Sequence, residues 1–144
     1  MRIRVHADDK PWDIAARCLA AIVTNCRATL SYPDGTHGST VEVLEQLTSE
    51  WAGRIEFLEE SDGELAIAIQ NGQVMRLRYA SAERVPESIR RVANHHQVFI
   101  ADRPVSTLGR IELLWYVVEQ SISFDYHRYG NLGPRSTEKR AETL

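Results

Sequence analysis

The stretch RIEFLEESDGELAIAIQNGQVMRLRY, residues 54–79, decides the fold class. Its apolar and β-branched residues predict strands at 54–59 and 74–79. Between the strands, Ser61-Asp-Gly-Glu64 has the spacing of a capping box, which predicts a helix over 62–70. A strand, a helix and a second strand joined this closely favour a right-handed crossover, and hence parallel strands.

The same alternation of short strands and longer helices continues along the rest of the chain. Further strands are predicted at 3–7, 27–32, 98–101 and 121–127, and further helices at 11–24, 40–52, 86–95 and 108–118. Ser39-Thr-Val-Glu42 has the spacing of a second capping box. The pattern predicts an α/β fold: a Rossmann-like three-layer domain with a mostly parallel sheet and a C-terminal edge strand or flap.

Each helix is expected to bury one apolar stripe against the sheet. The expected stripes are Val41, Leu44, Leu47 and Trp51; Ile89, Val92 and Ala93; and Ile111, Leu114, Trp115 and Val118. Arg76 and Arg78 alternate with apolar residues, which we interpret as a strand with one solvated end.

Composition narrows the classes of protein and of partner. The 144 residues are 43% hydrophobic and 26% charged, as in globular domains, and the length suits one domain. The net charge of −3, with scattered basic residues, argues against nucleic-acid binding. With no apolar run of membrane-spanning length and no signal peptide after Met1, we expect a cytoplasmic chain without a membrane span.

The predicted strand at 121–127 differs from the others because its two faces differ. Ile122, Phe124 and Tyr126 alternate with polar residues, which is typical of an edge strand or a flap that seeks another surface. We therefore expect a Rossmann-like domain over 1–120, a flap and turn over 121–134, and a disordered tail over 135–144. The expected interface residues are Ile122, Phe124, Tyr126, His127, Arg128, Tyr129 and Asn131.

One loop offers a candidate small-molecule site. Residues 32–39 lead into a predicted helix start, where free amides and the helix dipole favour an anion, and the candidate residues are Gly35, Gly38, Ser39 and Thr40. The alternative is a surface loop whose glycines serve turn geometry. The first βα loop, residues 6–11, contains no glycine, so it does not predict a dinucleotide cradle.

The cysteines and paired histidines favour structural roles. Cys18, one turn from Ile14 and Ile22, is predicted to be a small buried hydrophobe. Cys26, beside Arg27, is the candidate nucleophile under a third hypothesis, a residual aldehyde dehydrogenase activity. His95 and His96 end a predicted helix and point in different directions, so no shared metal site is expected.

The final third of the chain resembles a known family. The segments RLRYA (76–80), RVPESI (84–89), VFIADRP (98–104) and above all GRIELLWYVVEQSISFDYHRYGNLG (109–133) are similar to the extreme C-terminus of the long proline utilization A proteins. Those are bifunctional FAD- and NAD-dependent enzymes that oxidise proline, through 1-pyrroline-5-carboxylate and glutamate semialdehyde, to glutamate. The resemblance runs from about Arg2 to Gly133.

The resemblance implies a degenerate aldehyde-dehydrogenase-superfamily domain without activity of its own. Such a domain covers the tunnel between two active sites, supports assembly and substrate channelling, and ends in a docking flap. Tyr32-Pro33-Asp34 stands where active relatives carry Lys-Pro, and the turn at 59–63 is acidic instead of glycine- and serine-rich. We therefore expect no cofactor, catalytic residue or metal in this chain.

The expected partners are the catalytic modules of the parent enzyme or a second copy of the chain. Because no catalytic module precedes the resemblance, we expect a piece of a larger enzyme or a separately encoded remnant. The alternative is a freestanding small α/β module that binds an anionic ligand at the 32–40 loop.

Overall fold

The computed structural model describes residues 1–35, 39–51 and 53–123, and it contains one five-stranded parallel sheet. The strands are β1 (Arg2–Arg4), β2 (Ala28–Tyr32), β3 (Ile55–Glu59), β4 (Arg76–Arg78) and β5 (Phe99–Ala101). Their order is β3-β2-β1-β4-β5, as in a doubly wound Rossmann sheet. The predicted Rossmann-like α/β fold is confirmed.

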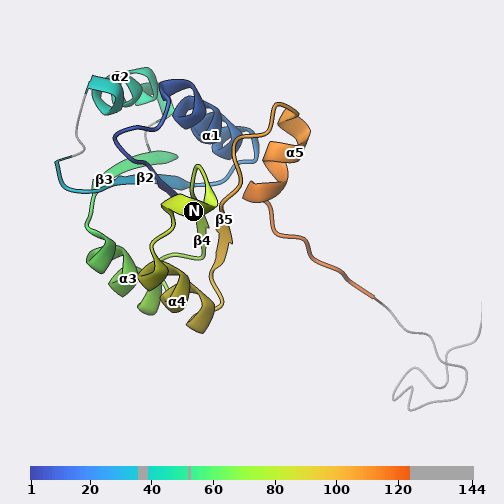
Figure 1. The fold of residues 1–144 in the computed structure, drawn as a ribbon. Helices are drawn as coiled ribbons and strands as arrows, with labels where there is room; N and C mark the ends of the chain where they lie inside the picture. Colours follow the sequence, from blue (N-terminus) through green and yellow to red (C-terminus); the bar gives the residue numbers. More distant parts are fainter. Residues whose placement is uncertain (36–38, 52, 124–144) are drawn as a thin grey trace, which may run out of the picture.

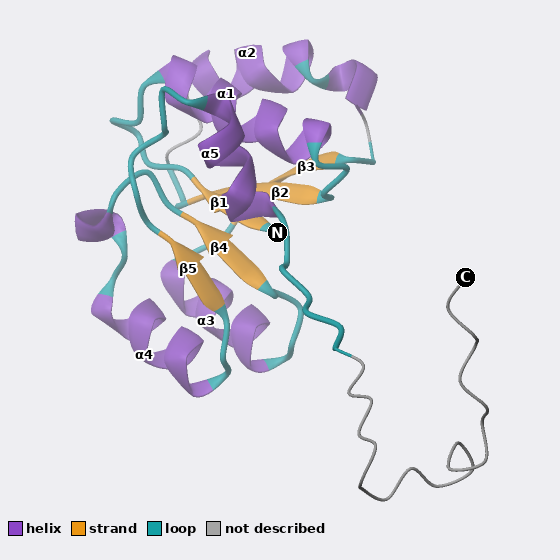
Figure 2. Cartoon of the chain, turned by 90° about the vertical axis from the view of Figure 1, so that its right-hand side faces the viewer, coloured by secondary structure: helices purple, strands orange, loops and turns teal. Residues whose placement is uncertain are grey.

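Helices cover both faces of the sheet and complete the three layers. They are α1 (Pro11–Val23), α2 (Ser39–Leu47), α3 (Asp62–Gln70), α4 (Glu87–His95) and α5 (Gly109–Leu113), with 3-10 turns η1 (Ser49–Trp51), η2 (Ala82–Arg84) and η3 (Leu114–Tyr116). In Figures 1 and 2, α1, α2 and α5 lie on one face of the sheet and α3 and α4 on the other.

Two apolar clusters hold the layers together. One joins Ile3 and Val5 to α1, α2 and Tyr116, and the other joins Leu77 to α3 and α4. Strand β1 supplies the fully buried Ile3 to the first cluster, and β4 supplies the fully buried Leu77 to the second. The core therefore sits on both sides of the two strands at the middle of the sheet.

Local sequence explains where most helices begin. Pro11 occupies the first helical position of α1, where a missing N–H costs nothing. The predicted capping box of α3 is confirmed: Ser61 Oγ accepts from Glu64 N–H, and the Glu64 carboxylate accepts from Ser61 N–H. α2 begins at Ser39, one residue before the predicted start, and the Ser39 side chain lies outside the described residues, so its predicted capping box with Glu42 stays a prediction.

The helices at 40–52 and 108–118 are shorter than predicted. α2 ends at Leu47, which is exposed, and α5 ends at Leu113 before a 3-10 turn. Val117 and Val118 follow, and β-branched residues continue a helix poorly. The stripe expected on α5 was wrong, since Glu112 and Tyr116 are buried there. The three expected stripe members that are exposed are Ile111, Leu114 and Val118.

The predicted sixth strand is not formed in the part that can be described. Residues 121–123 belong to no strand, and 124–127 lie outside the described residues. The flap and tail boundaries therefore stay predictions. None of the helices in 1–35, 39–51 and 53–123 has the length and apolar character needed to cross a membrane.

Candidate functional site

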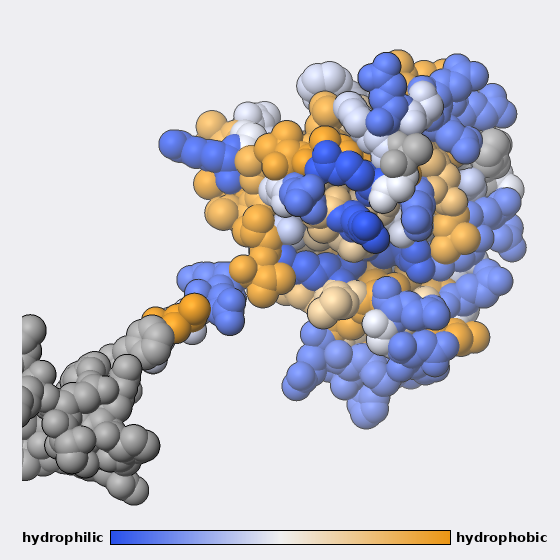
Figure 3. Space-filling model, turned by 180° about the vertical axis from the view of Figure 1, so that it is seen from behind, coloured by the Kyte–Doolittle hydropathy of each residue, from blue (hydrophilic) through white to orange (hydrophobic). Residues whose placement is uncertain are grey.

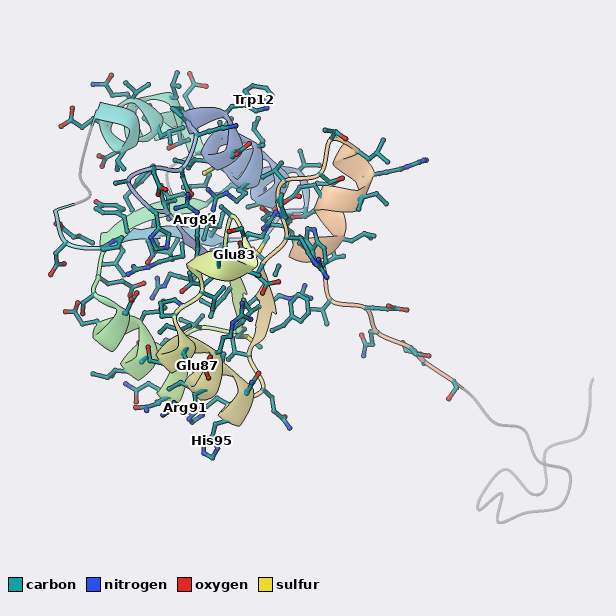
Figure 4. The ribbon with its side chains drawn as sticks, in the orientation of Figure 1. Trp12, Glu83, Arg84, Glu87, Arg91 and His95 are labelled. Atoms are coloured by element: carbon teal, nitrogen blue, oxygen red, sulfur yellow. The ribbon has the colours of Figure 1, made fainter. Side chains whose placement is uncertain are left out.

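The carboxyl edge of the sheet between β1 and β4 is the first place to look for a site. There the strand order reverses, and open α/β sheets bind ligands at such a switch point. The loop after β1, residues 5–10, faces the loop after β4, residues 79–86. Figure 4 labels two residues of the second loop, Glu83 and Arg84, near the middle of the molecule.

Arg84 bridges these two loops. Its guanidinium pairs with both carboxylate oxygens of Asp8, with Arg84 Nη2 at 2.8 Å from Asp8 Oδ2, and Nη1 lies 3.3 Å from Asp9 Oδ1. Asp9 also accepts from the fully buried Arg17 Nη2 at 2.7 Å. Asp9 is therefore a buried anion between two guanidinium groups, and it pins α1 to the switch point.

Arg4, the last residue of β1, ties three further segments to this edge. Its Nη1 donates to Ser31 Oγ at 2.7 Å and to the Glu60 carbonyl at 2.8 Å, and its Nη2 donates to Asp62 Oδ1 at 2.8 Å. The side chain is fully buried. One guanidinium thus joins the carboxyl ends of β1, β2 and β3 to the start of α3.

Arg78, the last residue of β4, makes the equivalent connection on the other face. It pairs with the buried Glu112 of α5 and donates to the Arg103 carbonyl at 2.7 Å. Glu112 also accepts from Tyr116 OH at 3.3 Å and from Ser106 N–H at 3.0 Å. The interpretation of a solvated Arg78 was wrong, because this arginine has a carboxylate partner far along the chain.

His6 and Tyr79 lie beside these ion pairs, with ring centroids 6.2 Å apart. Burial lowers the pKa of His6. The charge of Asp9 acts in the opposite direction, and the charges of Arg84 and Arg4 lower this pKa further. Burial also raises the pKa of Tyr79. Among the described residues, neither His6 Nε2 nor Tyr79 OH has a hydrogen-bond partner. Both groups are therefore held neutral at neutral pH.

The chemistry of this edge differs from that of a nucleotide site. A dinucleotide site presents backbone amides and glycines to the pyrophosphate at the first helix N-terminus. Here the loop before α1 presents the carboxylates of Asp8 and Asp9, and Pro11 at the first position of α1 has no N–H to offer. The arginines are engaged by protein carboxylates and carbonyls, so the edge forms a structural charge network.

The anion site predicted in the 32–40 loop is only partly described. Gly35 has a positive φ of 75°, and its amide donates to Glu59 Oε1 at 3.0 Å, so a carboxylate already uses that amide. Gly38 and the side chains of Ser39 and Thr40 lie outside the described residues. The described residues of this loop therefore add no observation in favour of a bound anion.

The cysteines have the environments that the sequence indicates. Cys18 is buried, and burial raises the pKa of its thiol to about 11, which keeps it protonated. Cys26 is half-buried, and its Sγ donates to the Arg27 carbonyl at 3.5 Å. The prediction for Cys18 is confirmed, and among the described residues Cys26 has no hydrogen bond to a basic side chain.

A second candidate site is an apolar surface at the end of the described chain. The C-terminal apolar surface consists of the exposed side chains of Leu108, Ile111, Leu114, Val117, Val118 and Ile122. Val118 is 78% and Ile122 70% exposed. Figure 3, seen from behind, shows hydrophobic side chains gathered on the side of α5 beside the described end of the chain.

The part of this surface that lies on α5 and η3 is held by contacts with the sheet. Phe99 of β5 stacks with Trp115 of η3 at a centroid distance of 6.2 Å, and the Arg76 guanidinium lies 4.8 Å from the centre of the Phe99 ring. Arg76 also donates to the Val117 carbonyl. Together with the Arg78–Glu112 pair, these contacts fix α5 and η3 on the sheet while their outer side chains stay exposed.

Of the predicted interface residues, Ile122 lies within the described part of the chain and the others follow it. Ile122 is exposed, as expected of a docking residue. Phe124, Tyr126, His127, Arg128, Tyr129 and Asn131 lie outside the described residues. The exposed part of α5 was missed, because the sequence places Ile111 and Leu114 on an apparently core-facing stripe.

The buried arginines were also missed, although the sequence contains a signal for them. The two central strands share one pattern, Arg2-Ile-Arg-Val5 and Arg76-Leu-Arg-Tyr79, and the second arginine of each ends its strand. Ile3 pairs in register with Arg78, so the side chains of Arg4 and Arg78 point to opposite faces of the sheet.

Comparisons with protein-family models, curated proteins and solved structures found no match to this chain.

Proposed function

We propose that this chain is a non-catalytic, cytoplasmic domain that works through protein contacts made by its C-terminal apolar surface. The observation that carries the proposal is the contrast between the two candidate sites. At the switch point, charged groups are paired with one another, whereas Ile111 of α5 and Leu114 of η3 are exposed on elements that are held on the sheet. An exposed apolar patch beside a fixed helix is typical of a protein–protein interface.

The resemblance of residues 109–133 gives the proposal its specific form. The chain would be the C-terminal domain of a bifunctional proline-catabolic enzyme, which converts proline to glutamate through 1-pyrroline-5-carboxylate. It would support assembly and channel the intermediate by covering the tunnel between the two active sites. FAD and NAD would belong to the catalytic modules, and the C-terminal apolar surface would dock on those modules.

The charge network gives this role a physical basis. A docking domain must hold its binding element in place before the partner arrives, since ordering it on binding would cost affinity. Arg78 and Glu112 supply that rigidity for α5. The competing anion-binding role has less support, because the Gly35 amide is bonded to Glu59.

The proposal is tested by calorimetry with the catalytic portion of a long proline utilization A protein that lacks its own C-terminal domain. The unaltered chain should bind, and Leu114→Glu and Val118→Glu should each weaken binding at least tenfold. Ile67→Glu is the matched control, because Ile67 is exposed on α3 in the opposite layer. Binding should also shorten the lag before NADH forms from proline.

Two results would count against the proposal. No heat of binding in a titration with the catalytic portion would contradict the proposed partner. Equal affinity of the Leu114→Glu and Ile67→Glu variants for the catalytic portion would show that the C-terminal apolar surface is not the binding site. A separate titration with NAD and with inorganic phosphate tests the alternative, which requires saturable heat that Ser39→Ala reduces.

A further inference from the structure

The outer side of α1 carries no charge. The exposed side chains of this helix are Pro11, Trp12, Leu19 and Val23, and Trp12 is 75%, Leu19 44% and Val23 68% exposed. Its two charged residues, Asp13 and Arg17, are half-buried and buried. A surface helix normally presents charged or polar residues to water, and one that is apolar all round is normally covered.

Three of the exposed residues fall on one line along the helix, together with the half-buried Ala16. The α1 stripe consists of Trp12, Ala16, Leu19 and Val23, which are spaced by four, three and four residues. At about 100° per residue they occupy an arc of about 60°, opposite the core-facing Ile14 and Cys18. Alternating spacings of three and four are what a second helix packed alongside requires.

The other helical layer provides the contrast. The outer side of α4 carries Glu87, Ser88, Arg91, Asn94 and His95, all exposed and polar. In Figure 4, Glu87, Arg91 and His95 follow one another along α4, and Trp12 lies at the far end of the molecule on α1. The absence of exposed charge is therefore a property of α1 itself and not of the chain's surface helices in general.

We propose that the α1 stripe binds the α1 stripe of a second copy of this chain, with the two helices antiparallel about a two-fold axis. An axis between Arg17 and Cys18 places Trp12 opposite Val23 of the second copy and Ala16 opposite its Leu19. Each contact then joins a larger side chain to a smaller one, as close packing requires. A self-complementary patch is the condition for a two-fold interface.

A second copy fits the electrostatics of the stripe as well. No side chain in the stripe is charged, so two identical faces meet without like-charge repulsion. The stripe shares no residue with the C-terminal apolar surface, so this dimer does not depend on the proposed function. A helix of an unrelated protein is the competing occupant, and the oligomeric state of the pure chain separates the two.

Sedimentation velocity of the full chain over a wide concentration range tests the proposal. The chain should dimerise reversibly, and Leu19→Glu and Val23→Glu should each raise the dissociation constant at least tenfold with the circular dichroism unchanged. Ile67→Glu and Leu114→Glu should leave the dimer intact. A monomer at every concentration, or a dimer that only Leu114→Glu disrupts, would overturn the proposal.

Cysteine cross-linking tests the antiparallel orientation, in a background carrying Cys26→Ser. A mixture of Trp12→Cys and Val23→Cys chains should form a cross-linked dimer on oxidation. Either variant alone should not, because the two copies of one position would lie about 16 Å apart along the helices, at 1.5 Å per residue. Cross-linking of each variant with itself, and none in the mixture, would overturn the antiparallel arrangement.

Discussion

Arg78 donates to a single oxygen of Glu112 from two nitrogens, with Nε at 3.0 Å and Nη2 at 2.7 Å from Oε1. Both side chains are shielded from water. The pair joins the end of a central strand to α5, which carries the exposed Ile111 and leads directly into the exposed Leu114 of η3. It is one of the contacts that connect the interior of the domain to the surface that we propose for docking.

Glu112→Leu is expected to lower the free energy of unfolding by about 3 kcal/mol, because it leaves Arg78 buried without its anion. Urea denaturation measures this change. The double variant Arg78→Met/Glu112→Leu serves as the control and should recover part of the loss, since it removes the unpaired charge as well. A loss below about 1 kcal/mol in Glu112→Leu would contradict a buried pair of this kind.

The neighbouring residues Asp8 and Asp9 offer a matched comparison. Asp9→Asn should destabilise the fold by about 3 kcal/mol, because Arg17 is fully buried and loses its anion. Asp8→Asn should have a far smaller effect, since the Asp8 side chain is exposed and its pair with Arg84 is screened by solvent. Thermal denaturation measures both effects, and an equal loss of stability in the two variants would contradict this prediction.

His6 predicts a pH dependence of stability. Burial lowers the pKa of the folded imidazole below its unfolded value near 6.5, so the unfolded chain binds the proton more readily. The stability that depends on a neutral His6 is fully present above that unfolded pKa. It is lost as the pH falls from there toward the folded pKa. His6→Gln should flatten the stability profile in this window, and a profile as steep as that of the unaltered chain would disagree.

The capping box of α3 also predicts a measurable effect. Ser61→Ala removes the oxygen that accepts from Glu64 N–H and should cost about 1 kcal/mol of unfolding free energy. Ser88→Ala is the control, because Ser88 is exposed within α4 and caps nothing in the described structure. Equal urea midpoints for the two variants would show that the cap is not formed.

Features set by neighbouring residues were the predictable part of this fold. Ser61 and Glu64 define a helix start over three residues, and Pro11 marks the start of α1, so both are readable from the chain alone. The parallel pairing followed from the short connections between strands and helices. The predicted burial of Cys18 followed from its helical spacing to Ile14.

Features set by distant residues could not be predicted in the same way. Arg78 is buried because Glu112 reaches it from a separate element, and nothing beside Arg78 in the sequence indicates that partner. The same pair turns Glu112 inward and leaves Ile111 and Leu114 exposed, which reverses the expected face of α5. The site was misjudged where one tertiary ion pair outweighed local periodicity.

The proposed function depends on docking of the C-terminal apolar surface on the catalytic modules of a proline-oxidising enzyme. Hydrogen–deuterium exchange of residues 109–123, measured with and without the catalytic portion of such an enzyme, tests it most directly. We expect slower exchange across this segment in the mixture and unchanged exchange across α4. Unchanged exchange at 109–123 under saturating conditions would contradict it.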